Sequence, residues 1–309
     1  MAETLFHAYT PLIFWTGVGL LLWRFTPKDF PRLLGRSLYW IGVPLQILAL
    51  VRRTEFSQLA SVVPMVTLAA LFLGLALALA SLWLLKHFSP KWSNRSSCGS
   101  FILAAILGNT GFVGLAIAPF FISDVDLSWL VLYSITHNVL GPYGFGVAVA
   151  SYFGRAAAKN HWWVLVRDVL SVPVLWAFIL GYTTQSYSLP ASLETGLQAF
   201  SAIVIPAAFT LIGMRLSQLQ GWKSFLTALL PASLKAIALP AAVGLGATLC
   251  GLSGDPRLSL VLMAGMPTAF LGLVVAEEYN LDRELIASSI VVSTILLLIT
   301  LPGWLLLFG

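Results

Sequence analysis

The sequence predicts an all-α integral membrane protein with ten transmembrane helices, arranged as two inverted five-helix repeats. Composition is the first reason, because 59% of the 309 residues are hydrophobic and only 9% are charged, whereas soluble domains carry about 25% charged residues. The second reason is a pair of interrupted apolar stretches at corresponding positions of the two halves. The third is the recurrence of prolines at a nearly constant offset between the halves.

Ten apolar runs account for most of the chain, and the connections between them are too short to hold a soluble domain. A helix needs about 20 apolar residues to cross a bilayer core of about 30 Å. The first run is preceded by Glu3 and followed by Arg24. A cleavable signal peptide has its positive charge before the apolar run, so we expect a retained helix. The predicted spans are roughly 8–23, 37–51, 58–85, 100–122, 128–153, 163–183, 195–214, 225–250, 257–276 and 285–308.

The distribution of Lys and Arg predicts how these spans are oriented. The loops after spans 1, 3, 5, 7 and 9 hold 13 of these residues, and the opposite loops hold only three, Arg52, Arg53 and Arg257. Positively charged loops stay in the cytoplasm, so both termini are predicted to lie outside. The net charge of +5 is dispersed over short loops without a continuous basic face. It therefore gives no indication of nucleic-acid binding.

The first interrupted stretch, Gly108–Ala118, reads GNTGFVGLAIA and lies inside the apolar run 100–122. Glycine weakens a helix, and asparagine prefers local hydrogen bonds to the backbone. Lipid cannot satisfy exposed backbone groups, so a broken helix is stable only against protein or a water-filled cavity. The stretch therefore predicts a discontinuous helix that lines a site.

The second stretch, Met266–Ala276, reads MPTAFLGLVVA and resembles the first at an offset of 158 residues, with five of eleven positions identical. Pro267 stands where Asn109 stands in the first copy. Interrupted segments at corresponding positions of two halves are the best indication in a sequence of a transporter's binding site.

Prolines support the same repeat. Since each half holds five spans, an odd number, the second half would cross the membrane in the opposite direction, which makes the repeats inverted. The predicted repeats are residues 1–153 and 154–309. The proline pairs are Pro11 with Pro173 and Pro44 with Pro206, both at offset 162, and Pro142 with Pro302 at offset 160.

Two broken helices would create an electrostatic site. The second half of each begins with unpaired N–H groups and the first half ends with unpaired C=O groups. Helix N-termini carry partial positive charge, so two crossing breaks would attract an anion and leave carbonyl ends for a cation. Pro267 lacks an N–H and disfavours helix at the residue before it, which would keep the second break open. The predicted substrate-binding residues at the breaks are Asn109, Thr110, Gly111, Met266, Pro267 and Thr268.

Ionisable residues inside membrane spans are hypotheses of function, and Lys235 is the clearest here, between Pro231 and Pro240 in span 8. One interpretation is a lysine that extends to the inner interface from a helix beginning near Pro231. The other is a positive charge that attracts an anion or stabilises the broken helices. The sequence leaves both open.

Span 5 contains His137 and Asn138, followed by Gly141 and Pro142. Since imidazole titrates near neutral pH, His137 could relay a proton; alternatively, it could be a neutral side chain bonded to a carbonyl freed by Pro142. Asn138 can donate and accept hydrogen bonds, so it suits either a substrate or an opened backbone.

No catalytic or metal-binding motif accompanies these residues. The two cysteines, Cys98 and Cys250, fall near opposite membrane faces, and no metal-ligand spacing exists. The sequence has no G-x-S-x-G elbow, no H-E-x-x-H pair and no intramembrane Asp pair. We expect neither an enzyme nor a bound metal or cofactor.

At these residues the chain resembles the auxin efflux carrier family, as a bacterial relative of the plant PIN-formed carriers, and more distantly the bile acid–sodium symporter fold. The resemblance covers nearly the whole chain. It rests on Gly108–Phe112 in span 4 and Met266–Ala269 in span 9, with support from Ile205-Pro206, Ile212-Gly213, Lys235, Pro240, Ser293-Thr294 and Leu301-Pro302.

The resemblance implies a scaffold domain of spans 1, 2, 6 and 7 and a transport domain of spans 3–5 and 8–10, with spans 4 and 9 crossing. It also implies an elevator-like motion and the transport of carboxylates such as auxin or dicarboxylates across a bacterial inner membrane. Asn109 and Pro267 would be the crossover positions and Asn138 a substrate contact. A homodimer is left open, and the long hydrophilic loop of the plant carriers is absent between spans 5 and 6.

The leading hypothesis is a secondary carrier of a small organic anion, either passive or linked to protons through His137. The alternative is a sodium-coupled symporter of the bile acid–sodium type, although neither break contains the acidic residue that such a sodium site would use. A channel or sensor that binds without transport is a less favoured third hypothesis.

Overall fold

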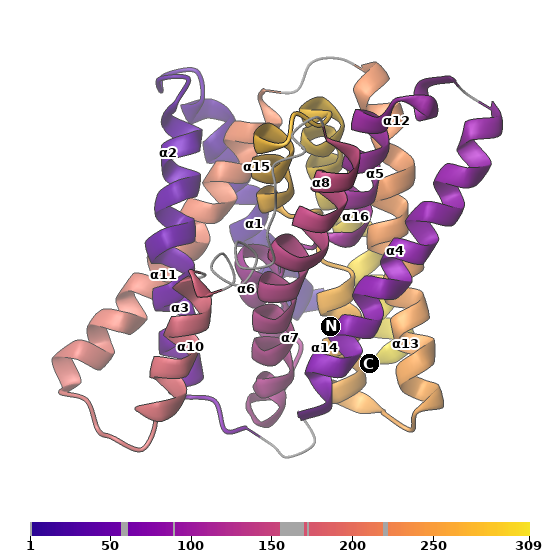
Figure 1. Ribbon diagram of the computed structural model, residues 1–309. Helices are drawn as coiled ribbons and strands as arrows, with labels where there is room; N and C mark the ends of the chain where they lie inside the picture. Colours follow the sequence, from indigo (N-terminus) through magenta and orange to yellow (C-terminus); the bar gives the residue numbers. More distant parts are fainter. Residues whose placement is uncertain (1, 57–60, 89, 155–169, 172, 219–221) are drawn as a thin grey trace.

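The computed structural model describes residues 2–56, 61–88, 90–154, 170–171, 173–218 and 222–309, and the regular secondary structure within these ranges is helical (Figure 1). The chain is therefore an all-α membrane protein. Six helical runs of the described residues are long and apolar enough to cross a membrane, and shorter apolar helices accompany them. The six are Glu3–Leu22, Phe30–Val51, Val63–Phe88, Ala191–Leu216, Phe225–Leu249 and Arg283–Phe308.

One group of helices packs around the contact between the first helix and α11. A Cβ atom on Gly213 would lie 2.0 Å from the Thr16 carbonyl oxygen, and one on Gly19 would lie 2.1 Å from the Thr210 carbonyl oxygen. Only glycine allows so close an approach, and small residues are typical of helix contacts in membranes. The group contains α1 (Ala2–Leu22), α2 (Phe30–Ser37), α3 (Val43–Val51), α10 (Pro173–Thr183) and α11 (Ala191–Leu216).

The remaining helices form a second group around α5 and α16. In it, α5 packs against α4 and α16, α12 runs along α16, and α14 contacts α7, α13 and α16. Its members are α4 (Val63–Phe88), α5 (Arg95–Ile106), α6 (Leu115–Ile117), α7 (Leu127–Leu140), α8 (Val147–Phe153), α12 (Trp222–Ser233), α13 (Leu239–Leu249), α14 (Gly254–Ala264), α15 (Phe270–Glu278) and α16 (Arg283–Phe308).

Several predicted spans are continuous helical runs that contain a π-helical segment. The segment Gly141–Gly146 joins α7 to α8, and Leu234–Ala238 joins α12 to α13. A third segment, Leu38–Gly42, joins α2 to α3, so this run begins at Phe30 rather than near the predicted residue 37. Part of predicted span 6, together with Arg155, Lys159 and Arg167 of the loop before it, lies outside the described residues.

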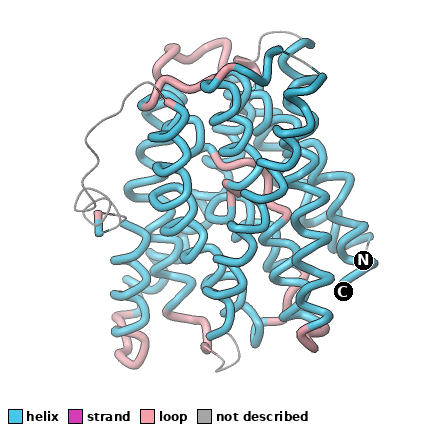
Figure 2. The backbone as a smooth tube through the Cα atoms, turned by 45° about the vertical axis from the view of Figure 1, so that its right-hand side comes forward, coloured by secondary structure: helices cyan, strands magenta, loops and turns pink. Residues whose placement is uncertain are grey.

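The chain leaves the helical conformation at both stretches where the sequence predicts a break. After α5 ends at Ile106, Leu107 is extended, and helix resumes at Thr110 with a π-helical turn. After α14 ends at Ala264, helix resumes at Phe270 with α15. Figure 2 shows such loop segments inside the bundle, between its two ends.

The two breaks are paired with each other. The Asn109 N–H donates to the Pro267 carbonyl at 2.6 Å, and the Ala269 N–H donates to the Leu107 carbonyl at 2.8 Å. Gly108 and Thr268 thus form one isolated antiparallel bridge. Each break satisfies backbone groups that the other has left without helical partners, as an apolar environment requires.

The connections after predicted spans 1, 3 and 9, which belong to the set of loops that together hold most of the Lys and Arg residues, share one end of the molecule. Those between α1 and α2, between α4 and α5, and between α15 and α16 lie at the upper end in Figure 1. The end of α3 and the connection between α13 and α14 lie at the lower end. These positions agree with the alternation of loops on which the predicted orientation depends.

Candidate functional site

A small cavity of about 40 Å³ lies where the second halves of the two broken helices begin. Gly111, in the first turn after the first break, lines one part, and Phe270 and Leu271, in the first turn of α15, line another. Asn109 and Asn138 are its amide side chains. The other lining residues are Tyr39, Val43, Gly108, Phe112, Val174 and Ala269. Since Tyr39, Val43 and Val174 come from the α1–α11 group, the cavity lies between the two groups of helices.

Asn109 begins the helix after the first break. Its side-chain Oδ1 accepts a hydrogen bond from the Phe112 N–H at 3.2 Å, which is how asparagine caps a helix N-terminus. Its own N–H is bonded to Pro267. Asn109 therefore connects the cavity, the first turn of one half-helix and the opposite break.

Asn138 reaches the cavity from the middle of the bundle, near the end of α7. Its Nδ2 donates to the Ser134 carbonyl at 2.7 Å and lies 3.2 Å from Thr110 Oγ1. Gly111 lies directly beside this amide, because a Cβ atom on residue 111 would be 3.4 Å from Asn138 Nδ2. Since glycine has no side chain, nothing from residue 111 lies over the amide. The structure thus brings three of the predicted residues, Asn109, Gly111 and Asn138, to one cavity wall.

The other predicted residues at the breaks are buried behind the cavity. Thr268 donates through its N–H to Ser293 Oγ at 2.9 Å and through its Oγ1 to the Ala104 carbonyl at 2.8 Å. Met266 is buried in the hydrophobic core, and Pro267 contributes its carbonyl to the paired breaks. These contacts support the backbone, and a direct substrate contact by Thr110, Met266, Pro267 or Thr268 stays a prediction.

Lys235 is fully buried, so the interpretation of a lysine that extends to the interface is wrong. Its Nζ donates to the carbonyl of Ala264, the last residue of α14, at 2.7 Å. A cation at a helix C-terminus is stabilised by the helix dipole. Gly108 provides the necessary space, because a Cβ atom there would lie 2.8 Å from Nζ. Lys235 therefore stabilises the second break from a position directly beside the first.

His137 is also buried, and its partners belong to the first break. Its Nε2 accepts from the Gly108 N–H at 3.3 Å and lies 3.4 Å from the Ile106 carbonyl. The predicted alternative, a bond to a carbonyl freed by Pro142, is wrong, since the opened backbone it meets is that of Ile106–Gly108. The ring is nearly parallel to that of Tyr133, with centroids 6.1 Å apart. His137 supports the break and does not line the small cavity.

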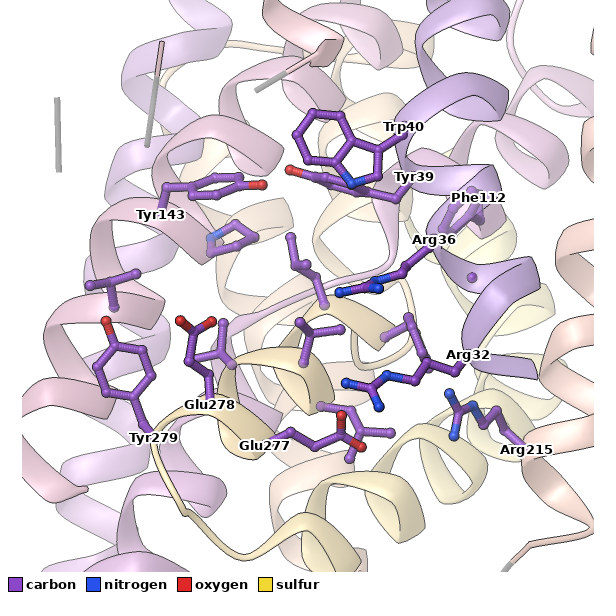
Figure 3. A pocket seen from close by; sticks show the side chains of 18 residues that line it. Arg32, Arg36, Tyr39, Trp40, Phe112, Tyr143, Arg215, Glu277, Glu278 and Tyr279 are labelled. Carbon is purple, nitrogen blue, oxygen red and sulfur yellow. The ribbon is translucent and has the colours of Figure 1, made fainter. Parts of the chain in front are cut away.

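A wider cavity of about 310 Å³, which we call the vestibule, adjoins the small one. The two share Tyr39, Phe112, Phe270 and Leu271 as lining residues. The charged side chains of the vestibule are Arg32, Arg36, Arg215, Glu277 and Glu278, and Figure 3 shows them around it.

Sequence reasoning missed the vestibule. It assigned Arg32 and Arg36 to a loop, whereas they lie one turn apart on α2. The signal that could have identified this helix is Pro31, because proline is favoured in the first turn. The aromatic residues that line the vestibule, such as Tyr39, Phe112 and Phe270, gave no signal in the sequence. Apolar side chains that line a cavity look the same in sequence as those that face lipid.

Comparison with known proteins agrees with a transport site. Residues 161–305 match the family described as membrane transport protein. An uncharacterized transporter of Methanocaldococcus jannaschii is 25% identical over 291 residues, which cover 91% of each chain. One of Methanothermobacter thermautotrophicus is 26% identical over 273 residues, covering 88% of this chain and 87% of its own. The uncharacterized transporter YfdV of Escherichia coli is 25% identical over 231 residues, covering 69% and 70%.

These relatives span most of the chain and are all named as transporters, and the matched family is one of membrane carriers rather than enzymes. The resemblance to auxin efflux carriers is thereby confirmed. Residues 161–305 are thus similar to a family of membrane transport proteins.

Proposed function

We propose that the protein is a secondary carrier of a small organic anion, with its central site at the small cavity. The observation that carries this proposal is the meeting of two half-helix N-termini, at Gly111 and at Phe270, on one cavity wall with two amide side chains. First-turn N–H groups lack acceptors within their helix and lie at the positive end of its dipole. A carboxylate is the group that such donors and the Asn109 amide would bind, and Asn138 would join them by exchanging one of its contacts with Ser134 or Thr110 for the ligand.

We further propose ten spans in two inverted repeats, residues 1–153 and 154–309. The antiparallel pairing of Gly108 with Thr268 supports it, because inverted repeats would bring their broken helices together head to head. The two packing groups of helices support a scaffold of spans 1, 2, 6 and 7 and a transport domain of spans 3–5 and 8–10. With the cavity between these groups, an elevator-like displacement of one group against the other would provide alternating access.

We propose that anion transport is coupled to protons through His137. Coupling of transport to sodium is the alternative. His137 is bonded to the first break, so a change in its protonation would alter the Gly108 N–H contact next to the cavity. Sodium has less support, because neither break offers a carboxylate and the described residues contain no group of three or more His, Cys, Asp or Glu side chains. Oxygen ligands from freed carbonyls remain the basis of the alternative.

Thermal stabilisation of the purified protein by a panel of carboxylates, each with and without sodium and at two pH values, tests this function. A ligand at 100 times its Kd stabilises the native state by about 2.7 kcal/mol. We expect stabilisation by a carboxylate without sodium, and loss of any pH dependence in His137→Gln. A ligand that binds only with sodium would replace this proposal with the symporter, and a panel without binding would contradict the anion site.

We propose that the Lys- and Arg-rich end faces the cytoplasm of a cell membrane, which in a bacterium is the inner membrane. The native cysteines offer a direct test, since Cys98 is buried and Cys250, at the opposite end, is exposed. In intact cells we expect an impermeant thiol reagent to label Cys250. In a Cys250→Ser background, Arg53→Cys should also be labelled and Lys28→Cys should not. The reverse pattern would invert the orientation.

A further inference from the structure

We propose that Phe112 and Phe270 are alternate anchor residues, each of which holds the second group of helices against the α1–α11 group in one of the two states of transport. Phe270 is anchored in the present structure. Phe112 would be anchored in the other state, in a hollow at the opposite end of the α1–α11 group. This inference rests on the proposed repeats and elevator-like displacement, and it names the residues that stabilise each state.

Phe270, the first residue of α15, lies in a seat on the α1–α11 group. A Cβ atom on Gly35 of α2 would lie 3.0 Å from Phe270 Cε1, so glycine gives the ring its space. The same Cβ atom would lie 3.4 Å from Leu211 Cδ2 of α11. The guanidinium of Arg215, also on α11, lies over the ring at 4.8 Å from its centroid, which is a cation–π contact. The seat of Phe270 therefore consists of Gly35, Leu211 and Arg215.

A hollow of about 10 Å³ lies between the end of α3 and the beginning of α11, at the lower end in Figure 1. Its lining residues are Ala49, Arg52, Arg53, Glu194, Leu197 and Gln198. Three of them correspond to the three seat residues at an offset of 162, the offset that also relates Pro44 to Pro206. The pairs are Gly35 with Leu197, Leu211 with Ala49, and Arg215 with Arg53. The hollow thus has the residues of a second seat.

The surroundings of the seat and of the hollow correspond as well. At the same offset, Glu194 and Gln198 in the hollow match Arg32 and Arg36 in the vestibule. Five of the six lining residues of the hollow therefore have a counterpart in the seat or in the vestibule. The agreement covers the hollow as a whole, which places it where an inverted repeat would put the second seat.

Phe112 is the ring that fits this hollow, because it corresponds to Phe270 at the offset of 158 that relates the two breaks. Each lies in the first turn after its break. In the present structure Phe112 packs against a cluster of Leu38, Val204, Ala208 and Leu211. Leu197 is about 10 Å further along α11 than Val204, toward the hollow. A displacement of about this length would bring Phe112 to the hollow and withdraw Phe270 from its seat.

Arg53 is available to lie over a ring in the hollow. It is exposed, and within the described ranges its side chain forms no hydrogen bond or ion pair. The neighbouring Arg52 is occupied, since its guanidinium donates to the Tyr187 carbonyl at 2.7 Å and lies 3.9 Å from Glu194. Arg53 would therefore take over, in the second state, the contact that Arg215 makes in the first. Cation–π contacts at exposed sites are weak, so neither anchor would prevent exchange between the states.

Cysteine crosslinking of the full chain in membranes tests the proposal. In a Cys98→Ser/Cys250→Ser background, a short bifunctional thiol reagent should link Phe270→Cys to Arg215→Cys, and also Phe112→Cys to Leu197→Cys. The pair Phe112→Cys/Gly196→Cys is the control, because a Cβ atom on Gly196 meets open space and Gly196 does not line the hollow. Absence of the link between residues 112 and 197, or equal linkage of the control pair, would overturn the proposal.

A shift in the equilibrium between the states tests the anchoring role itself. Arg215→Gln removes the cation–π contact from the first seat and should raise the rate of linkage between residues 112 and 197 about threefold. Arg24→Gln removes an exposed arginine from the same end, outside both cavities, and should leave this rate unchanged. An unchanged rate in Arg215→Gln would also overturn the proposal.

Failure of the carrier function is a different result. It would appear as an absence of carboxylate flux in liposomes while residues 112 and 197 still become linked, and the two anchors would then belong to a conformational change that does not carry an anion. Flux without this linkage would retain the carrier function and reject Phe112 as an anchor.

Discussion

Asn109→Ala is expected to reduce carrier flux about 100-fold or more while the protein remains folded and inserted. The substitution removes the cap on Phe112, which costs about 1 kcal/mol of stability. The backbone bond from residue 109 to Pro267 does not involve the side chain and would persist. The large loss of flux would come from the cavity wall, where the amide contributes to the proposed carboxylate site. Uptake into liposomes and thermal unfolding measure the two effects separately.

Asn94→Ala is the matched control for this experiment. Asn94 caps α5 through the same kind of contact, with its Oδ1 accepting from the Ser96 N–H at 3.1 Å, but it lines neither cavity. Both variants should lose similar stability, and only Asn109→Ala should lose transport. Equal transport in the two variants would remove Asn109 from the site.

Lys235→Met is the second substitution with a large expected effect, again on flux. Methionine has similar length but cannot donate to the Ala264 carbonyl, so the end of α14 loses its buried cationic partner. An unsatisfied buried acceptor costs about 1–3 kcal/mol, and the connection from Gly265 to Ala269 loses support on one side. Because this connection holds Phe270 and Leu271 at the cavity, we expect flux to fall at least tenfold.

Lys28→Met provides the control, since Lys28 is exposed in the connection between α1 and α2. It removes the same charge from the surface, and its flux should stay within about twofold of the native protein. Normal flux in Lys235→Met would show that the second break needs no cation, and would contradict the role assigned to this lysine.

The breaks could be predicted because their signal is local. Gly108, Asn109 and Pro267 each disfavour helix in their own way, and the structure opens the chain at these residues. The pairing between the breaks could not be derived in the same manner, because its hydrogen bonds join residues that are about 160 positions apart. For the same reason, the sequence could not separate Asn109, which lines the cavity, from Met266 and Thr268, which lie behind it.

For the charged residues, the sequence predicted the collective pattern but not the individual contacts. Lys and Arg were informative as a set, because the orientation rule depends on their number in each loop. Their individual contacts depend on where a helix begins and what packs beside it. Lys235 lies in the interior because α14 offers a carbonyl there, and Arg215 meets Phe270 because α11 and α15 approach each other.

The paired breaks also have a consequence for biogenesis. The Leu107 carbonyl and the Asn109 N–H are satisfied by Ala269 and Pro267, which are synthesised about 160 residues later. At about 5–20 residues per second, the delay is on the order of 10–30 s. If the first break forms during this time, its backbone groups have no partners and lipid cannot satisfy them. Insertion of the first break must therefore be delayed, hydrated or chaperoned until the second half has been translated.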